Sequence, residues 1–180
     1  MTTLRIIAGK WRSRLIRFPA APDLRPTPDR VRETLFNWLG QDLTGQHTLE
    51  PYAGSGALSF EALSRGAAHA VLWDQNKEVV ATLKNTARTL DTAQAEIRQA
   101  DALAALSEER RRFDLIFLDP PFARDDWAFL LPTCAALLNE GGFLYVEASR
   151  FIEAYPPELT RLKQGRAGVA HFGLYKRAQK

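Results

Sequence analysis

Several residue types are scarce in this chain of 180 residues, and each scarcity excludes a class of protein. The single cysteine, Cys134, excludes an internal disulfide framework, and its apolar helical setting predicts a buried side chain. No run of about 18 apolar residues occurs, so we expect no membrane span. The N-terminus lacks the apolar core of a signal peptide, which favours a cytoplasmic protein. His47, His69 and His171 are scattered without metal-ligand spacing, so we expect no metal.

Charge is modest overall but unevenly placed. The net charge is +3, yet residues 1–40 alone hold eight Lys or Arg against three acidic residues. The remainder of the chain is therefore slightly acidic. A basic front on a nearly neutral body indicates a polyanionic partner, although a merely solvated basic face would give the same composition.

The basic front begins with a predicted hairpin over residues 4–18, whose strands 4–7 and 14–18 flank a turn at 9–13. Basic side chains in or beside this turn surround one aromatic ring, in the run Lys10, Trp11, Arg12 and Arg14. Cations suit phosphates and an aromatic ring suits a base, so the pairing is typical of nucleic-acid binding. Trp11 could equally pack against the core.

The rest of the chain alternates between two kinds of pattern. A proline-rich linker at 19–28 precedes a predicted helix from Asp29 to about Leu39. From residue 48 onward, strand-like and helix-like runs alternate, which predicts an α/β fold with a parallel sheet covered on both faces. The predicted strands are 48–52, 70–73, 96–99, 113–118 and 142–147, the helices are 58–64, 77–90, 102–109 and 127–138, and 159–163 with 169–176 should pair antiparallel at the sheet edge.

The most informative motif is Asp119-Pro120-Pro121-Phe122, directly after the apolar run 113–118. It places a carboxylate, two rigid residues and an aromatic ring at the carboxyl end of a buried strand, where open α/β sheets keep their ligands. Adjacent prolines fix φ and supply carbonyls without N–H groups. An acceptor beside a flat ring suits a planar group that carries an amine.

Three further loops follow successive predicted strands and fall on the same edge of the sheet. Gly54 and Gly56 permit a tight turn and close approach of a ligand to the backbone. The third glycine of a dinucleotide fingerprint would fall at Ser59, so a nucleoside-type cofactor fits better. Asp74 is placed to bind ribose hydroxyls, whereas Asp101 can accept from an adenine amine or cap the next helix.

Taken together, these motifs resemble the RsmD family of class I methyltransferases, which act on ribosomal RNA. The segments that carry the resemblance are Arg5–Arg12, Arg25–Leu39, Ala53–Gly66 and Asp119–Phe122. Three positions depart from the family pattern. Glu50-Pro51-Tyr52 replaces a usual Asp-Leu-Phe, Ser59 replaces a common glycine, and Asp74 replaces a usual glutamate.

The resemblance implies a Rossmann-like fold with a seven-stranded, mostly parallel sheet and one antiparallel strand near its edge. It implies S-adenosyl-L-methionine as cofactor and the N2 amine of a guanine in 16S ribosomal RNA as target, with guanine 966 expected. The RNA could be part of a small-subunit assembly particle. We expect a monomer in which residues 1–45 dock RNA and residues 46–180 form the methyltransferase core.

The implied site residues fall into three groups. The catalytic group is Asp119, Pro120, Pro121 and Phe122. The cofactor group is Glu50, Tyr52, Ala53, Gly54, Ser55, Gly56, Asp74, Gln75, Asp101 and Ala102. The RNA group is Lys10, Trp11, Arg12, Arg14, Arg25, Thr27, Arg30 and Arg32.

Other functions share parts of this pattern. An amino methyltransferase acting on adenine N6 in DNA or RNA would use a similar cofactor loop and motif. A protein glutamine methyltransferase usually begins the motif with Asn. A dinucleotide-dependent oxidoreductase is disfavoured by Ser59, and a non-catalytic RNA-binding module leaves the predicted pocket unexplained.

Overall fold

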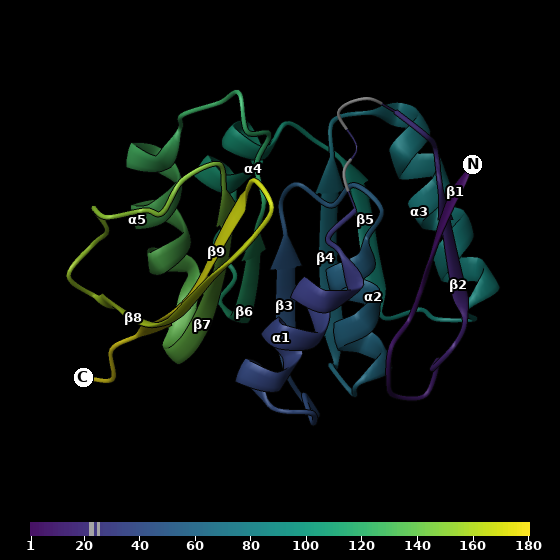
Figure 1. Cartoon of the computed structure of the whole chain (residues 1–180), viewed down its shortest axis with the longest axis horizontal. Helices are drawn as coiled ribbons and strands as arrows, with labels where there is room; N and C mark the ends of the chain where they lie inside the picture. Colours follow the sequence, from purple (N-terminus) through teal and green to yellow (C-terminus); the bar gives the residue numbers. More distant parts are fainter. Residues whose placement is uncertain (22–23, 25) are drawn as a thin grey trace.

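The computed structural model describes residues 1–21, 24 and 26–180 (Figure 1). Strands and helices alternate along the chain, as the sequence predicts. The elements are β1 (Thr2–Arg5), β2 (Leu15–Phe18), α1 (Asp29–Leu39), β3 (His47–Glu50), α2 (Ala57–Ser64), β4 (His69–Asp74), α3 (Lys77–Thr89), β5 (Ala95–Gln99), α4 (Ala102–Glu108), β6 (Phe113–Leu118), α5 (Trp127–Leu137), β7 (Leu138–Ala148), β8 (Leu159–Ala167) and β9 (Ala170–Arg177).

The main sheet has seven strands in the order β5-β4-β3-β6-β7-β9-β8. Strands β3 to β7 pair in parallel, and β9 runs antiparallel to both β7 and β8. The sheet is therefore mostly parallel with one antiparallel strand near its edge, which confirms the predicted fold. Because the parallel strands share one direction, their carboxyl ends form a single edge, which we call the catalytic rim.

Alternating side chains of the sheet supply two hydrophobic cores, one on each face. Leu115 and Phe117 of β6 pack with α1, α2, α3 and the N-terminal hairpin. Ile116 and Leu118 pack on the opposite face with α4 and α5. Cys134 of α5 is completely buried in this second core, as its apolar setting predicts.

Several strand boundaries differ from the prediction, among them those of the hairpin and of β7. The first hairpin strand lies two residues earlier than expected and the second begins one residue later, so residues 6–14 form a wide turn in which the Ile6 N–H donates to Arg14 O at 2.9 Å. Strand β7 begins at Leu138 rather than at 142, because its pairing with β6 shifts between Phe113 and Leu115. The Gly141-Gly142 pair therefore lies within an irregular strand instead of in the loop before it.

The N-terminal hairpin is held against α2 by a buried carboxylate. Glu61 accepts the backbone N–H groups of Ile7 and Ala8 at 2.9 and 3.0 Å. Its oxygens also lie 3.5 Å from an Arg32 nitrogen and 3.0 Å from an Arg65 nitrogen. These contacts fix the hairpin to the helix that follows the cofactor loop.

Arg32 corrects one of the RNA-binding predictions. Its side chain is fully buried, donates to the carbonyls of Thr27 and Arg5, and pairs with Asp29 and Glu61. A guanidinium enclosed in this way cannot reach a phosphate. Arg32 therefore has a structural role inside the protein. The sequence alone could not distinguish it from the exposed Arg30 on the same helix.

Candidate active site

The predicted site loops meet at the catalytic rim. Glu50 ends β3, Asp74 ends β4, and Asp119 directly follows β6. Asp101 follows β5 after one intervening residue. Since β5, β4, β3 and β6 are consecutive neighbours in the sheet, these four acidic residues lie along one edge, as the strand pattern predicts.

The loop after β3 has the geometry of a close ligand approach. Gly54 and Gly56 both adopt positive φ, at +54° and +74°, which favours glycine. A Cβ on Gly56 would lie 2.7 Å from the Phe60 ring, so this glycine also permits tight packing of α2. The Gly54 N–H donates to Asp74 Oδ2 at 3.0 Å, and Ala53 N–H donates to Trp73 O at 2.8 Å. The neighbouring strand end therefore holds the loop in place.

The other predicted cofactor residues occupy varied settings. Ser55 and Ala102 are buried, whereas Gln75 and Asp101 are exposed at the rim. Asp101 caps α4 by accepting the Ala104 N–H at 3.0 Å, so the structure shows the capping role that the sequence left open. Its second oxygen remains a candidate acceptor for a ligand.

Tyr52 presents an unsatisfied polar atom at this edge. Its hydroxyl is buried and has no hydrogen-bond partner among the described residues. Desolvation raises the pKa of Tyr52 to about 12, so it stays protonated and remains a donor. Buried polar groups without partners are uncommon, and a bound polar ligand would explain this one.

Two departures from the family pattern contact each other. The Ser59 hydroxyl and backbone N–H both donate to Glu50 Oε2, at 2.8 and 3.1 Å. Glu50 reaches one methylene farther than Asp would, and Ser59 supplies a donor that glycine lacks. The longer carboxylate and the added hydroxyl therefore form one matched pair.

Glu50 should make stability depend on pH. Desolvation raises its pKa to about 8, despite the two bonds from Ser59. The stabilisation of the fold by the protonated carboxyl is fully present below the unfolded-state pKa near 4.5 and is lost as pH rises through about 8.

The free energy of unfolding of Glu50→Gln should therefore rise by about 1–4 kcal/mol relative to that of the native chain between pH 5 and pH 9. Urea unfolding at both pH values measures this gain. Glu33→Gln, on the exposed face of α1, is the control, and equal pH profiles for all three proteins would contradict the assignment.

A third acidic residue completes a row of carboxylates that sequence reasoning missed. Glu147 of β7 lies beside Asp119, because Leu118 pairs with Val146 one residue earlier. Alternation along β3, β6 and β7 places Glu50, Asp119 and Glu147 on the face that carries the first core. We call these three residues the carboxylate row. Their strands are neighbours, about 4.8 Å apart. Glu147 is the last residue of the predicted strand 142–147, and only the register between β6 and β7 shows that it lies beside Asp119.

The members of the carboxylate row differ in their partners. Ser59 satisfies Glu50. Glu147 accepts from the Tyr145 hydroxyl at 3.0 Å and from the side chain of buried Thr27. Asp119, in the middle, has no hydrogen bond with any described residue. The row therefore leaves its central carboxylate available to a ligand.

Electrostatics also single out Asp119. Desolvation raises its pKa well above the ordinary value even though part of its side chain is exposed, and the charges of Glu147 and Glu50 raise it further. Such a carboxylate is poised to bind a cation or a strong hydrogen-bond donor. Pro120 beside it is buried, Pro121 is exposed and Phe122 is half-buried. The motif thus combines a rigid backbone, an acceptor and a ring at one point of the rim.

The basic turn of the hairpin lies far from Asp119. Lys10 N–H donates to Ser64 O at the end of α2, and an Arg14 guanidinium nitrogen donates to Thr89 O at the end of α3. Both helices end at the sheet edge opposite the catalytic rim, and Figure 1 shows the turn joining β1 and β2 at that lower edge. The six-residue strand β4 makes this separation about 20 Å.

Burial also changes the interpretation of Trp11 and Thr27. Trp11 is 7% exposed and packs in the first core, with the Lys10 ammonium 4.5 Å from its ring centroid. It is a core residue and not a stacking platform for RNA bases. Thr27 faces Glu147 inside the molecule. Arg12 and Arg30 are exposed, and Arg25 lies outside the described residues.

Comparison with known proteins places this geometry in a family. Residues 4–176 match the model of a family described as Conserved hypothetical protein 95, to which the RsmD methyltransferases belong. The chain belongs to the RsmD family. RsmD relatives include "Ribosomal RNA small subunit methyltransferase D" of Escherichia coli K12, 37% identical over 97% of this chain and 90% of that protein. The Haemophilus influenzae protein of the same name is 37% identical over 96% of this chain and 93% of its own length.

Solved structures agree with membership of the RsmD family. The Escherichia coli protein yhhF is 35% identical, covers 99% of this chain and 100% of its own, and superposes with a TM-score of 0.89. A Haemophilus influenzae methylase structure is 34% identical, covers 99% and 100%, and has a TM-score of 0.80. Family membership confirms the predicted enzyme class, an S-adenosylmethionine-dependent methyltransferase. In the described part of the chain, no helix is long and apolar enough to cross a membrane.

Proposed function

We propose that this enzyme transfers the methyl group of S-adenosylmethionine to the N2 amine of a guanine in 16S ribosomal RNA, with guanine 966 as the target. The observation that carries the proposal is the central carboxylate of the row. Asp119 has no hydrogen bond with any described residue, lies beside a rigid Pro-Pro loop and is followed by an aromatic ring. We take small-subunit ribosomal RNA as the substrate because the names of the relatives give it as theirs.

The site suits S-adenosylmethionine. The tight turn at Gly54, the ribose-competent position of Asp74, and Tyr52, whose buried hydroxyl has no hydrogen-bond partner among the described residues, lie after β3 and β4 on one half of the rim. When bound, this cofactor supplies a methyl group activated by a sulfonium. A cation bound beside the carboxylate row would favour the ionised carboxylates, whose pKa values desolvation raises in its absence.

Asp119 and the Pro120 carbonyl are the proposed acceptors of the two N–H bonds of the target amine. Guanine N2 is a poor nucleophile because its lone pair is shared with the ring. Two acceptors draw the nitrogen toward tetrahedral geometry and turn its lone pair toward the methyl group. Positive charge would develop on the nitrogen as it accepts the methyl group, and Asp119 would stabilise that charge before taking the departing proton. Phe122 is placed to stack on the extruded base, which offsets part of the cost of unstacking.

The basic turn is proposed to contact RNA at a distance from the target nucleotide. Charge reversal at Lys10, Arg12 and Arg14 should raise KM for RNA and lower the log–log salt slope by up to about 2, since each phosphate contact contributes about 0.7. Binding titrations at several salt concentrations measure this. Reversal at Lys84, Arg110 and Lys180 changes the charge equally elsewhere. An unchanged salt slope in the first variant would remove the turn from the RNA surface.

Methyl transfer from labelled cofactor tests the function directly. The substrates are naked 16S RNA and small-subunit assembly particles, followed by mapping of the modified base. We expect label on the N2 of a single guanine. Label on adenine N6 instead would replace guanine as the target, and absence of transfer to either substrate would contradict the proposal.

A further inference from the structure

The catalytic rim has two halves, and only one is assigned to the cofactor. The cofactor residues follow β3, β4 and β5, all on one side of Asp119 in the strand order. On the other side lie the rim ends of β7, β9 and β8. If the proposed function holds, the target base enters beside Asp119, and the RNA strand that carries it must continue across this second half of the rim.

The second half of the rim carries cations and rings in register. Ala148 of β7 pairs with His171 of β9, which pairs with Arg166 of β8. Arg150 and Phe151 follow β7 after one intervening residue, Ser149. Glu147, next to Ala148, is the neighbour of Asp119 in the carboxylate row. Arg166 is therefore about three strand spacings, roughly 15 Å, from the catalytic carboxylate along the same edge.

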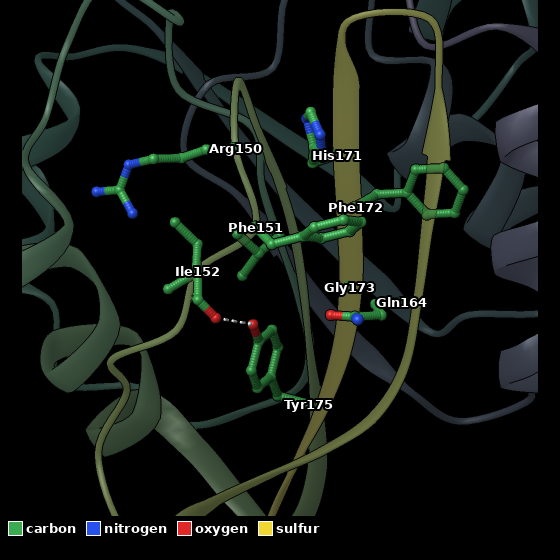
Figure 2. A pocket seen from close by; sticks show the side chains of 9 residues that line it. Arg150, Phe151, Ile152, Gln164, His171, Phe172, Gly173 and Tyr175 are labelled. Carbon is green, nitrogen blue, oxygen red and sulfur yellow. Dashed lines mark hydrogen bonds between the residues drawn. The ribbon is translucent and has the colours of Figure 1, made fainter.

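A small pocket of about 10 Å³, room for about one water molecule, lies beside these strands, with the Phe151 and His171 rings in its wall (Figure 2). The rings of Phe151 and His171 meet edge to face, with centroids 4.6 Å apart and planes at 84°. Figure 2 shows Arg150 extending away from this pair. The Nδ1 atom of His171 is buried and has no hydrogen-bond partner among the described residues, so the pocket holds a polar group that its own walls leave unsatisfied.

The two arginines are accessible to an anion. The Arg150 side chain is 57% exposed, and its ion pair with Asp125 is long, at 3.5 Å, between two exposed groups. Such pairs contribute little and exchange readily for a phosphate. Arg166 is exposed and donates to Gly168 O at 3.0 Å, which leaves most of its donors accessible to solvent.

We propose that Arg150, Phe151, Arg166 and His171, the flanking surface, bind the single-stranded RNA next to the target nucleotide. The arginines bind phosphates, and the half-exposed Phe151 ring, packed edge to face on His171, stacks on a neighbouring base. Rings interleaved with cations are the arrangement that single-stranded nucleic acids require. This inference rests on the proposed function, because an extruded base at Asp119 is what brings the chain here.

Binding of a short labelled single-stranded RNA that contains one guanine tests the flanking surface. Arg150→Glu with Arg166→Glu should weaken binding about tenfold or more and lower the log–log salt slope by about 1.4, for two phosphate contacts. Phe151→Leu should weaken binding about fivefold or more through lost stacking, with an unchanged slope. The control, Lys84→Glu with Arg110→Glu, carries the same charge change on exposed positions away from this half of the rim.

The outcomes separate this inference from the proposed function. Cofactor affinity and melting temperature, measured on every variant, should stay at the native value, so that a folding defect is not mistaken for lost binding. If the Arg150/Arg166 variant binds the RNA with the same affinity and slope as the control variant, the flanking surface is refuted, even if the native enzyme methylates ribosomal RNA. If the native protein binds RNA through this surface but methylates no guanine, the surface stands and the proposed reaction fails.

Discussion

Asp119→Ala should lower the rate of methyl transfer by about 10²- to 10³-fold or more while cofactor affinity stays near the native value. The variant removes the acceptor that is aimed at the developing charge on the amine, whereas the cofactor loops at Gly54 and Asp74 are untouched. Single-turnover kinetics with saturating RNA measure the chemical step, and calorimetry measures cofactor binding. Because the pKa of Asp119 is raised, the native rate should also increase with pH until this carboxyl is ionised.

The same substitution should not destabilise the fold. Asp119 makes no hydrogen bond with a described residue, and its charge is opposed by desolvation, Glu147 and Glu50. Removing it should leave the free energy of unfolding unchanged or raise it near neutral pH. Asp114→Ala, at the other end of β6, should instead lower the free energy of unfolding and leave the rate of methyl transfer unchanged. Asp114 accepts from His47 N–H and from the Asn139 side chain, both at 2.9 Å, so its loss costs stability and spares turnover. Full activity in Asp119→Ala would overturn the catalytic assignment.

The parts of the fold that sequence reasoning predicted are those set by local pattern. Strand β6 is a buried apolar run, so both its existence and its position could be predicted. The motif after it, and the loops after β3, β4 and β5, had to share one rim once the sheet was parallel. Each motif alone is weak evidence of a site, but the parallel topology of the sheet predicts that all of them lie together at one edge.

The parts that the sequence could not provide depend on register and burial. Glu147 becomes a member of the site only because β7 pairs with β6 in one particular register. Arg30 and Arg32 are alike in sequence, yet one faces solvent and the other is enclosed by Glu61 and Asp29. The charge pattern of the basic turn predicts an RNA contact but says nothing of its distance from the site. Its contacts with the ends of α2 and α3 place it at the opposite edge.

Glu61→Ala should produce the largest loss of stability, about 3–5 kcal/mol. The side chain is completely buried between Arg32 and Arg65, which are 0% and 3% exposed. Its removal leaves two buried guanidinium groups without their shared carboxylate. It also leaves the N–H groups of Ile7 and Ala8 without acceptors. Each of these losses is costly because the groups cannot reach water without moving the hairpin.

Urea unfolding measures the total loss, and amide hydrogen exchange shows where it occurs. Ile7 and Ala8 should lose protection first, before the strands of the main sheet, because Glu61 accepts their N–H groups directly. Glu33→Ala, on the exposed face of α1, removes the same side chain without a buried partner and should change stability by less than about 0.5 kcal/mol. Equal stability of the two variants would mean that hydrophobic residues such as Ile6 and Ile16 hold the hairpin alone. If Glu61→Ala instead loosens the hairpin and weakens RNA binding while cofactor affinity is kept, the buried carboxylate is what carries the basic turn as a rigid part of the enzyme.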